Sequence, residues 1–169
     1  MKEPLSTVTN AAYIILAAVV AIQDPDSMLL AASLMALGVA SGLFHYYGSV
    51  IDSPSHRADE GAIYVVLSVL LIQIWGAPWW LLLPVAGGLT VLLTKMKAAD
   101  LFKIAPLLSL AIILSLLLVG QTAVALAVLG LGAISALVRF KMIESDLTHA
   151  LWHILSATGL YFAWLGTIN

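Results

Sequence analysis

The stretch SMLLAASLMALGVASGLFHYYG, residues 27–48, contains no Asp, Glu, Lys or Arg. A helix of this length spans about 30 Å, which matches the hydrocarbon core of a bilayer. In both directions along the chain, similar apolar runs follow one another with short polar connections. The sequence therefore predicts an all-α, polytopic membrane protein folded as a bundle of seven transmembrane helices. The seven runs cover residues 5–22, 27–48, 60–75, 77–94, 101–119, 122–139 and 147–167.

The composition of the 169-residue chain agrees with this interpretation, because 62% of the residues are hydrophobic and only 9% are charged. The runs are rich in Leu and Ala and lack the period-two alternation of strands, which favours helices that satisfy their own backbone in lipid. No linker divides the chain, so residues 1–169 are predicted to form a single domain. The chain has no clustered basic tract, which excludes a nucleic-acid partner. It has no cysteine, so any metal ligands must be His, Asp or Glu.

The basic residues indicate how the bundle is oriented in the membrane. Seven spans place the N-terminus and the second, fourth and sixth connections on one side. All Lys and Arg residues then fall on that side, whereas the opposite connections carry Asp24 and Asp26. By the positive-inside rule, the side that holds the N-terminus is cytoplasmic. The basic residues are Lys2, Arg57, Lys95, Lys97, Lys103, Arg139 and Lys141.

Three histidines are predicted to lie at similar depth near the cytoplasmic face. In THALWHIL, residues 148–155, His149 and His153 are four positions apart, which places both rings on one face of a helix. His45 lies near the cytoplasmic end of the second helix, and Asp59 opens the third. Burying several ionisable groups costs free energy that a shared metal ion compensates. Three imidazoles without a thiolate favour Zn2+, with the fourth tetrahedral position left for water.

Two residues beside this predicted zinc site are candidates for catalysis. Asp59 could act as general base toward water activated by the metal, and Ser41, one helical turn from His45, could donate a hydrogen bond to an oxyanion. Alternatively, Asp59 caps the third helix and Ser41 bonds to its own backbone. Asp52 and His56 compete for the role of Asp59, but both fall in the long second connection, where solvated polar surface is the expected environment.

Three motifs together resemble the signatures of the alkaline ceramidase family. They are SGLFH at residues 41–45, ADEGAIY at 58–64 and HALWHIL at 149–155. The stretch EPLSTVTN, residues 3–10, is similar to that family's sequence at the start of its first helix. The family belongs to a wider superfamily of seven-helix membrane hydrolases that includes the adiponectin and progestin receptors and the haemolysin III proteins.

The resemblance implies zinc-dependent hydrolysis of the amide bond of a lipid such as ceramide, a sphingolipid. It implies a multi-pass membrane location and a lipid substrate that enters from the bilayer. The residues that it assigns are His45, His149 and His153 as zinc ligands, with Ser41 and Asp59 assisting hydrolysis.

The chain also departs from the family's pattern. The segment between His45 and Asp59 is longer than in typical ceramidases, which keeps Asp52 as an alternative to Asp59. Some family members hold calcium with acidic residues of an N-terminal segment, of which only Glu3 has a counterpart here. Calcium is therefore not expected. The chain is short for the family, and we expect a member from a prokaryotic plasma membrane.

Two classes of function are consistent with these features. The first is a zinc-dependent lipid amidohydrolase, in which activity requires the metal. The second is a seven-helix receptor or signalling protein of the same fold, in which zinc is structural and no turnover occurs. Replacing Asp59 distinguishes the two, because only the hydrolase needs a general base.

Overall fold

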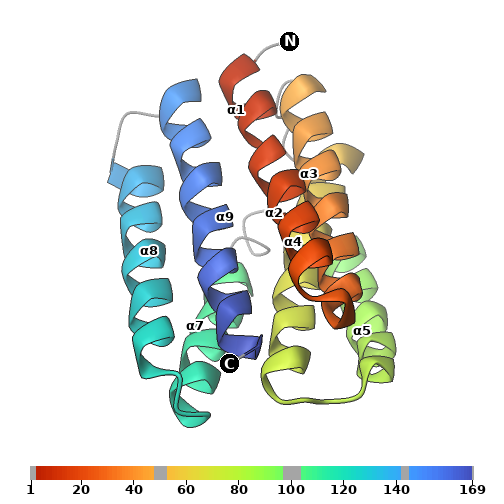
Figure 1. The fold of residues 1–169 in the computed structure, drawn as a ribbon. Helices are drawn as coiled ribbons and strands as arrows, with labels where there is room; N and C mark the ends of the chain where they lie inside the picture. The colour runs from red at the N-terminus through yellow and green to blue at the C-terminus, as the bar shows by residue number, and fades with distance from the viewer. Residues whose placement is uncertain (1–2, 48–52, 97–103, 142–144, 169) are drawn as a thin grey trace.

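A computed structural model describes residues 3–47, 53–96, 104–141 and 145–168, and the regular secondary structure in these ranges is entirely helical (Figure 1). The prediction of an all-helical chain is confirmed. With α1 and α2 taken together, the α-helices of these ranges correspond one to one with the seven predicted segments. The elements are α1 Pro4–Thr9, α2 Ala11–Gln23, η1 Pro25–Ser27, α3 Met28–Tyr47, α4 Pro54–Ile74, η2 Trp79–Leu81, α5 Leu82–Lys95, α7 Ile104–Leu118, α8 Thr122–Lys141 and α9 Asp146–Ile168.

The start of α4 differs from the prediction, which placed it at residue 60. The helix begins at Pro54, where proline has no backbone N–H to leave unsatisfied. The Ser53 side chain caps it by accepting a hydrogen bond from the His56 backbone N–H at 3.1 Å. Hydrophobicity alone could not detect the first two turns of α4, because most of their residues are polar. Consequently Asp59 lies in the second turn of α4 and does not cap the helix.

The first predicted run is interrupted at Asn10, which separates α1 from α2. The Asn10 side-chain amide donates a hydrogen bond to the Ser6 carbonyl oxygen at 2.7 Å, and the Asn10 carbonyl oxygen accepts one from the Tyr13 backbone N–H at 3.1 Å. Asn10 is 1% exposed. This polar residue is tolerated inside the bundle because its side chain takes part in the turn that joins the two helices.

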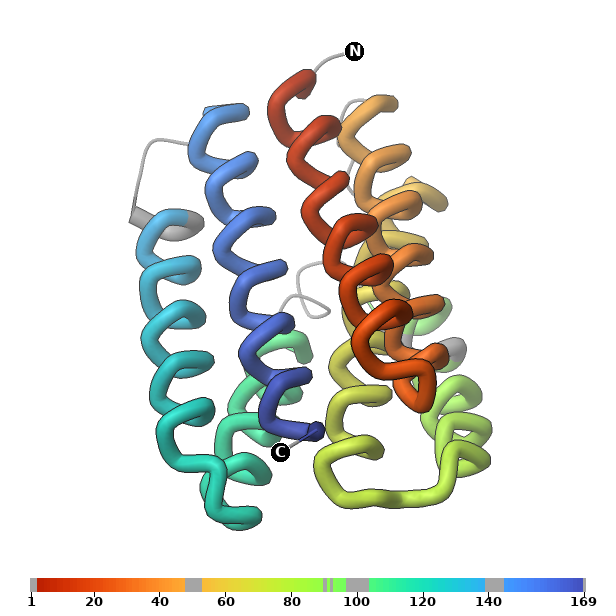
Figure 2. Tube along the Cα trace, in the orientation of Figure 1, coloured from red at the N-terminus to blue at the C-terminus, as the bar shows by residue number. Residues whose placement is uncertain are grey.

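The helices close a ring with α5 on its outside. α1 and α2 pack against α3, α3 against α4, α4 against α7, α7 against α8, and α8 against α9, which returns to α1 and α2. α5 packs against α4, and Figure 2 shows it at the periphery. The N-terminus and the start of α9 lie at one end of the bundle, and the C-terminus lies at the other.

The inner face of each helix follows the periodicity expected of an amphipathic helix. In α2, Tyr13, Leu16, Ala17 and Val20 are buried, at the spacing of one helical face. The buried apolar side chains of the other ring helices meet them in one core. Its members include Leu30, Leu34 and Leu37 of α3, Leu67 and Leu70 of α4, Ile112 and Leu116 of α7, Ala125 of α8, and Ala157 and Trp164 of α9.

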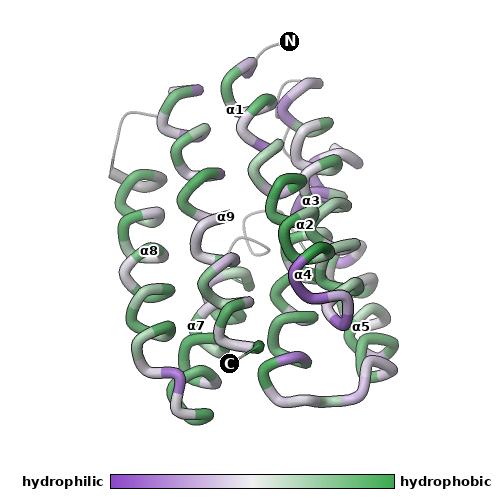
Figure 3. The backbone as a smooth tube through the Cα atoms, in the orientation of Figure 1, coloured by the Kyte–Doolittle hydropathy of each residue, from purple (hydrophilic) through white to green (hydrophobic). Residues whose placement is uncertain are grey.

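Most residues along the helices are hydrophobic (Figure 3), and many of their apolar side chains are exposed on the outer surface. Ile22 is 80% exposed and Leu118 is 76% exposed, and many other Leu, Ile and Val side chains are similarly uncovered. Soluble proteins rarely expose apolar surface of this extent. Among the described residues, two helical segments, Pro4–Gln23 and Pro25–Tyr47, are long and apolar enough to cross a membrane.

Gly38 allows α3 to lie close to the junction of α1 and α2. A methyl group on Gly38 would lie 2.7 Å from Ile14 Cγ1 and 3.2 Å from the Asn10 carbonyl oxygen. We expect Gly38→Ala to lower the free energy of unfolding by about 1–3 kcal/mol through overpacking. In Gly87→Ala, the added methyl meets nothing within 4 Å, so higher helix propensity should raise stability by about 0.5–1 kcal/mol. Thermal unfolding of both variants measures this contrast, and equal stabilities would contradict the close packing.

Candidate metal centre

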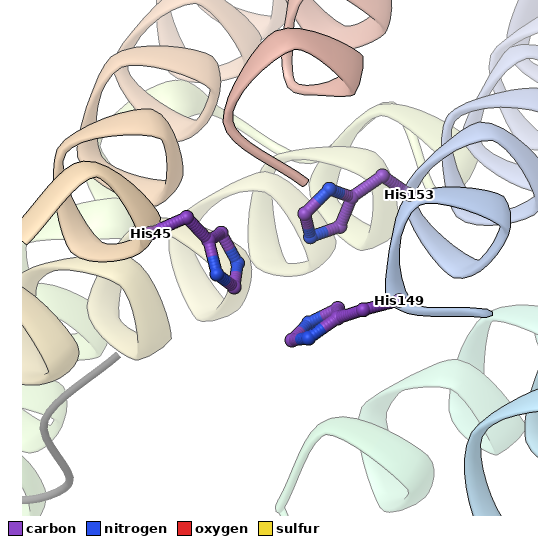
Figure 4. A group of neighbouring side chains, drawn as sticks. All are labelled: His45, His149 and His153. Carbon is purple, nitrogen blue, oxygen red and sulfur yellow. The ribbon is translucent and has the colours of Figure 1, made fainter. Parts of the chain in front are cut away.

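Three histidines from two helices converge at the end of the bundle that holds the N-terminus. His45 projects from the last turn of α3, and His149 and His153 project from the first two turns of α9 toward it (Figure 4). One ligand atom of each ring lies within 4.8 Å of the others. The ring centroids are 4.4 Å apart for His45 and His149, and 4.9 Å apart for the other two pairs. The structure therefore brings together the three histidines that the sequence proposed as ligands.

Two of the three histidines are buried, and the third is partly exposed to solvent. His45 is 1% exposed and His153 is fully buried, whereas the His149 side chain is 19% exposed. His149 also lines a cavity that runs into the bundle. A small ligand could therefore reach the cluster past His149.

The hydrogen bonds around the rings test whether the cluster fits a metal ion. Glu3 Oε2 lies 2.6 Å from His45 Nδ1, and Thr9 Oγ1 lies 3.2 Å from His153 Nδ1. His153 Nε2 is buried and has no hydrogen-bond partner in the described structure. A buried polar atom without a partner is costly, and coordination would satisfy it. Histidine ligands commonly donate a hydrogen bond from their second ring nitrogen to an oxygen acceptor such as a carboxylate, as His45 does to Glu3. The residues fit a metal ion bound through imidazole nitrogens.

Asp59 and Ser41 lie close together near this cluster. Asp59 is 8% exposed and Ser41 is 2% exposed, and the Ser41 hydroxyl lies near the Asp59 carboxylate. Asp59 Oδ1 is buried without a hydrogen-bond partner within the described residues. Asp59 lines the cavity, as His149 does, but Ser41 is not among the lining residues. The geometry thus places Asp59 toward the cavity and Ser41 behind it.

Of Asp52 and His56, the two alternatives to Asp59, the structure describes only His56. Asp52 lies outside the described residues. His56 was expected to be solvated, and this expectation is wrong, because α4 begins before it and only 1% of the residue is exposed. Its ring lies 5.1 Å from the Phe44 ring, and its Nε2 lies 4.0 Å from Glu60 Oε1. Glu60 is also buried and accepts a hydrogen bond from the Tyr64 hydroxyl at 2.6 Å.

The cavity beside the histidines has a volume of about 910 Å³ and lies among α4, α7, α8 and α9. Its acidic and histidine side chains, including Glu3, Asp59 and His149, come from the end of the bundle that holds the histidines. Deeper in the ring, its walls are mainly aliphatic. They include Leu110 and Ile113 of α7, Val128 and Leu129 of α8, and Leu155 and Leu160 of α9. A cavity of this size and polarity suits a long apolar ligand with one polar group at the histidine end.

Sequence reasoning assigned no role in the site to Glu3, Thr9 or Asp146. Asp146 is the first residue of α9 and precedes the apolar run 147–167. Its carboxylate accepts hydrogen bonds from the backbone N–H groups of Leu5 at 2.8 Å and Ser6 at 2.7 Å, which are unsatisfied donors of the first turn of α1. The Ser6 hydroxyl also donates to it, at 2.6 Å. The sequence signal for Glu3 was its place in the stretch EPLSTVTN, which resembles the ceramidase pattern. The contacts of Asp146 with α1 and of Thr9 with His153 join residues about 140 positions apart, so no local sequence pattern reveals them.

Asp146 should stabilise the attachment of α1 to α9 in a pH-dependent way. Desolvation raises the pKa of Asp146, but the hydrogen bonds from Ser6 and Leu5 and the nearby His149 outweigh it, so its pKa lies below the ordinary value. A lowered pKa in the folded state means that this stabilisation is complete above about pH 4, the unfolded pKa, and is lost as the pH falls through the folded value.

We expect Asp146→Ala to lower the free energy of unfolding by about 1 kcal/mol at pH 7, as for the loss of a helix cap. Partial exposure of the carboxylate keeps the effect modest. Denaturant unfolding at pH 7 and near pH 3 measures it. The difference between wild type and variant should shrink at the lower pH, and a difference that does not change with pH would contradict the role of the carboxylate.

No family model, curated protein or solved structure matches the chain. The functional assignment accordingly depends on the histidine cluster, its hydrogen-bond partners and the cavity.

Proposed function

We propose that the protein is a zinc-dependent integral-membrane hydrolase that cleaves the amide bond of a lipid such as ceramide. The observation that carries the proposal is the position of the cluster of His45, His149 and His153 at the polar end of a large aliphatic cavity. A lipid amide has the matching chemistry, because one hydrolysable polar group is attached to a long hydrocarbon chain. The resemblance of the three motifs to alkaline ceramidases supports the same substrate class.

Zinc is the proposed metal because the ligand set contains imidazoles and no thiolate. Three protein ligands are typical of catalytic zinc sites, which keep one position for water or substrate. A bound zinc ion would supply a Lewis acid that polarises the substrate carbonyl and makes water nucleophilic near neutral pH.

Asp59 is the proposed general base and acid. Its Oδ1 has no partner in the described structure and its side chain lines the cavity, so this oxygen can accept the proton of the attacking water. The same carboxyl group then delivers the proton to the amine that leaves when the amide C–N bond breaks. Ser41, which lies near the Asp59 carboxylate, is proposed to orient it by donating a hydrogen bond. We therefore assign Ser41 a positioning role, in place of the direct contact with an oxyanion that the sequence suggested.

The apolar surface of the bundle supports a membrane location. Two segments are long and apolar enough to span a bilayer, and the outward-facing side chains of the other helices are largely aliphatic. Seven spans in a prokaryotic plasma membrane with a cytoplasmic N-terminus agree with the positive-inside rule. Arg57 and Lys95 lie at the same end of the bundle as the histidines, so this orientation puts the metal site near the cytoplasmic face. The lipid would enter the cavity from the bilayer.

Release of fatty acid from a panel of N-acyl lipids tests the proposal. The purified protein in detergent micelles should hydrolyse at least one member of the panel. A chelator should abolish the release, and added Zn2+ should restore it. Mass spectrometry of the released acid identifies the preferred chain. A protein that holds zinc stoichiometrically and hydrolyses no lipid amide in the panel would contradict the hydrolase and favour the receptor with a structural metal.

A further inference from the structure

The short helix α1 lies between the two helices that carry the histidines, since it packs against both α3 and α9. Two of the side chains in the N-terminal segment, defined here as residues 3–9, contact the histidine cluster. They do so from opposite ends of the segment, one toward each helix. The segment therefore bridges the two parts of the metal centre.

Glu3 determines which nitrogen of His45 can bind a metal. A carboxylate accepts hydrogen bonds, so at 2.6 Å His45 Nδ1 carries the hydrogen and donates it to Glu3 Oε2. The ring then coordinates through Nε2. The same oxygen lies 4.0 Å from His149 Nδ1, which places its negative charge beside a second ligand. A carboxylate on the outer nitrogen fixes the ring orientation and makes the ligand nitrogen a stronger donor.

Thr9 does the same for His153. The Thr9 hydroxyl donates its hydrogen to a backbone carbonyl of its own helix, with Leu5 O at 2.9 Å and Ser6 O at 3.2 Å. Its oxygen is then the acceptor toward His153 Nδ1, so that nitrogen carries the hydrogen. The lone pair is left on Nε2, which is the buried atom without a partner in the described structure. Thr9 thereby selects the tautomer of His153 that can bind a metal.

The position of the segment is fixed independently of these two contacts. The Asp146 carboxylate holds the first turn of α1 through the backbone N–H groups of Leu5 and Ser6. Asp146 is itself in α9, one turn before His149. Glu3 and Thr9 are consequently held in place by α9, the helix that carries two of the proposed ligands.

We propose that the N-terminal segment is the outer shell of the metal centre, in which Glu3 and Thr9 are positioning residues that set the ring orientation and tautomer of His45 and His153. The inference rests on the metal site of the proposed function and does not depend on hydrolysis. Its consequence is that metal affinity depends on residues far from the ligands in sequence. Outer-shell partners of this kind typically contribute about 10–100-fold to metal affinity.

Zinc affinity of the full chain, measured by competition with a chromophoric chelator, tests this inference. Glu3→Gln removes the charge and Thr9→Val removes the hydroxyl while keeping the shape, and each should weaken binding about 10-fold or more. Thr9→Ser keeps the hydroxyl and should bind zinc as the wild type does. The visible spectrum of bound Co2+ should shift in Thr9→Val, because the His153 ring loses the acceptor that orients it, whereas Glu3→Gln keeps an oxygen that accepts from His45 Nδ1 and tests the loss of the charge.

Two matched control substitutions remove a hydroxyl and a carboxylate charge from residues that do not contact the histidines. Thr158→Val deletes a hydroxyl that bonds to the Ile154 carbonyl oxygen in α9, and Asp26→Asn neutralises a carboxylate at the opposite end of the bundle. Both should change zinc affinity by less than about 2-fold, as surface substitutions do. The thermal midpoint of each metal-free variant shows whether the fold is retained.

The outcomes separate this inference from the proposed function. A wild type that binds no zinc would overturn the metal site itself. A wild type that binds zinc, together with Glu3→Gln and Thr9→Val variants that bind as tightly as the controls, would overturn only the positioning role. Weak binding by Thr9→Ser, equal to that of Thr9→Val, would likewise overturn the assignment of the Thr9 hydroxyl.

Discussion

The purified wild-type protein is expected to contain one zinc ion per chain, and the His149→Ala variant is expected to lose it. His149 is one of three imidazoles whose ligand atoms lie within 4.8 Å of one another. Removing it leaves two protein ligands, fewer than catalytic zinc sites use. The loss of affinity should exceed the roughly 10–100-fold seen when an outer-shell partner is removed. Elemental analysis after dialysis measures the zinc content.

His149 is the best of the three histidines for this test because its side chain is 19% exposed, so its truncation leaves a smaller cavity than truncation of His45 or His153. His56→Ala is the control, and because His56 is more buried than His149, its thermal midpoint is measured beside its zinc content. His56 is a buried histidine at the same end of the bundle that lies outside the cluster, and its replacement should leave the zinc content unchanged. A metal-free wild type, or equal zinc contents in the two variants, would contradict the assigned ligands.

The second large effect is expected from Asp59→Asn, which should reduce turnover of the lipid amide by about 10²–10⁴-fold while leaving the zinc content at one ion per chain. Asparagine has nearly the same shape as aspartate and can still accept a hydrogen bond, but it cannot take up the proton of the attacking water. Single-turnover rates of fatty acid release, measured with zinc-loaded wild type and variant, give the effect on the chemical step.

Asp26→Asn is the control for this substitution, because Asp26 lies at the end of the bundle opposite the histidines. The Asp26→Asn variant should hydrolyse the lipid amide as fast as the wild type. Ser41→Ala should lose less activity than Asp59→Asn, since Ser41 acts through Asp59. If Asp59→Asn retains full activity, Asp59 is not the base, and Asp52 becomes the carboxylate to test. If neither the wild type nor the variant turns over a lipid amide, the receptor alternative is favoured.

The helices could be predicted from the sequence wherever hydrophobicity alone defines them. The run at residues 27–48 corresponds to α3, Met28–Tyr47, and the run at 147–167 corresponds to α9, Asp146–Ile168. The prediction failed where polar residues are helical, as in the first two turns of α4. There, a serine cap and a proline at the first position decide where the helix begins.

The candidate ligands could be predicted from local spacing for His149 and His153, and for His45 from the depth that the charge-based orientation of the helices gives it. His149 and His153 share a face because an α-helix repeats every 3.6 residues, and this follows from their spacing alone. The environment of His56 could not be obtained in the same way. Its burial depends on contact with Phe44, which lies in a different helix.

By itself, the sequence determined the helical class, the approximate extent of the helices and the paired histidines of α9, because these follow from periodicity and composition within single segments. Only the tertiary structure decided that His45 meets the pair, that Asp59 and not Ser41 lines the cavity, and that Glu3 and Thr9 hold the rings. Those facts depend on how each helix is rotated and which helix it packs against. Such packing is decided by contacts between residues far apart in the chain, including the attachment of α1 to Asp146.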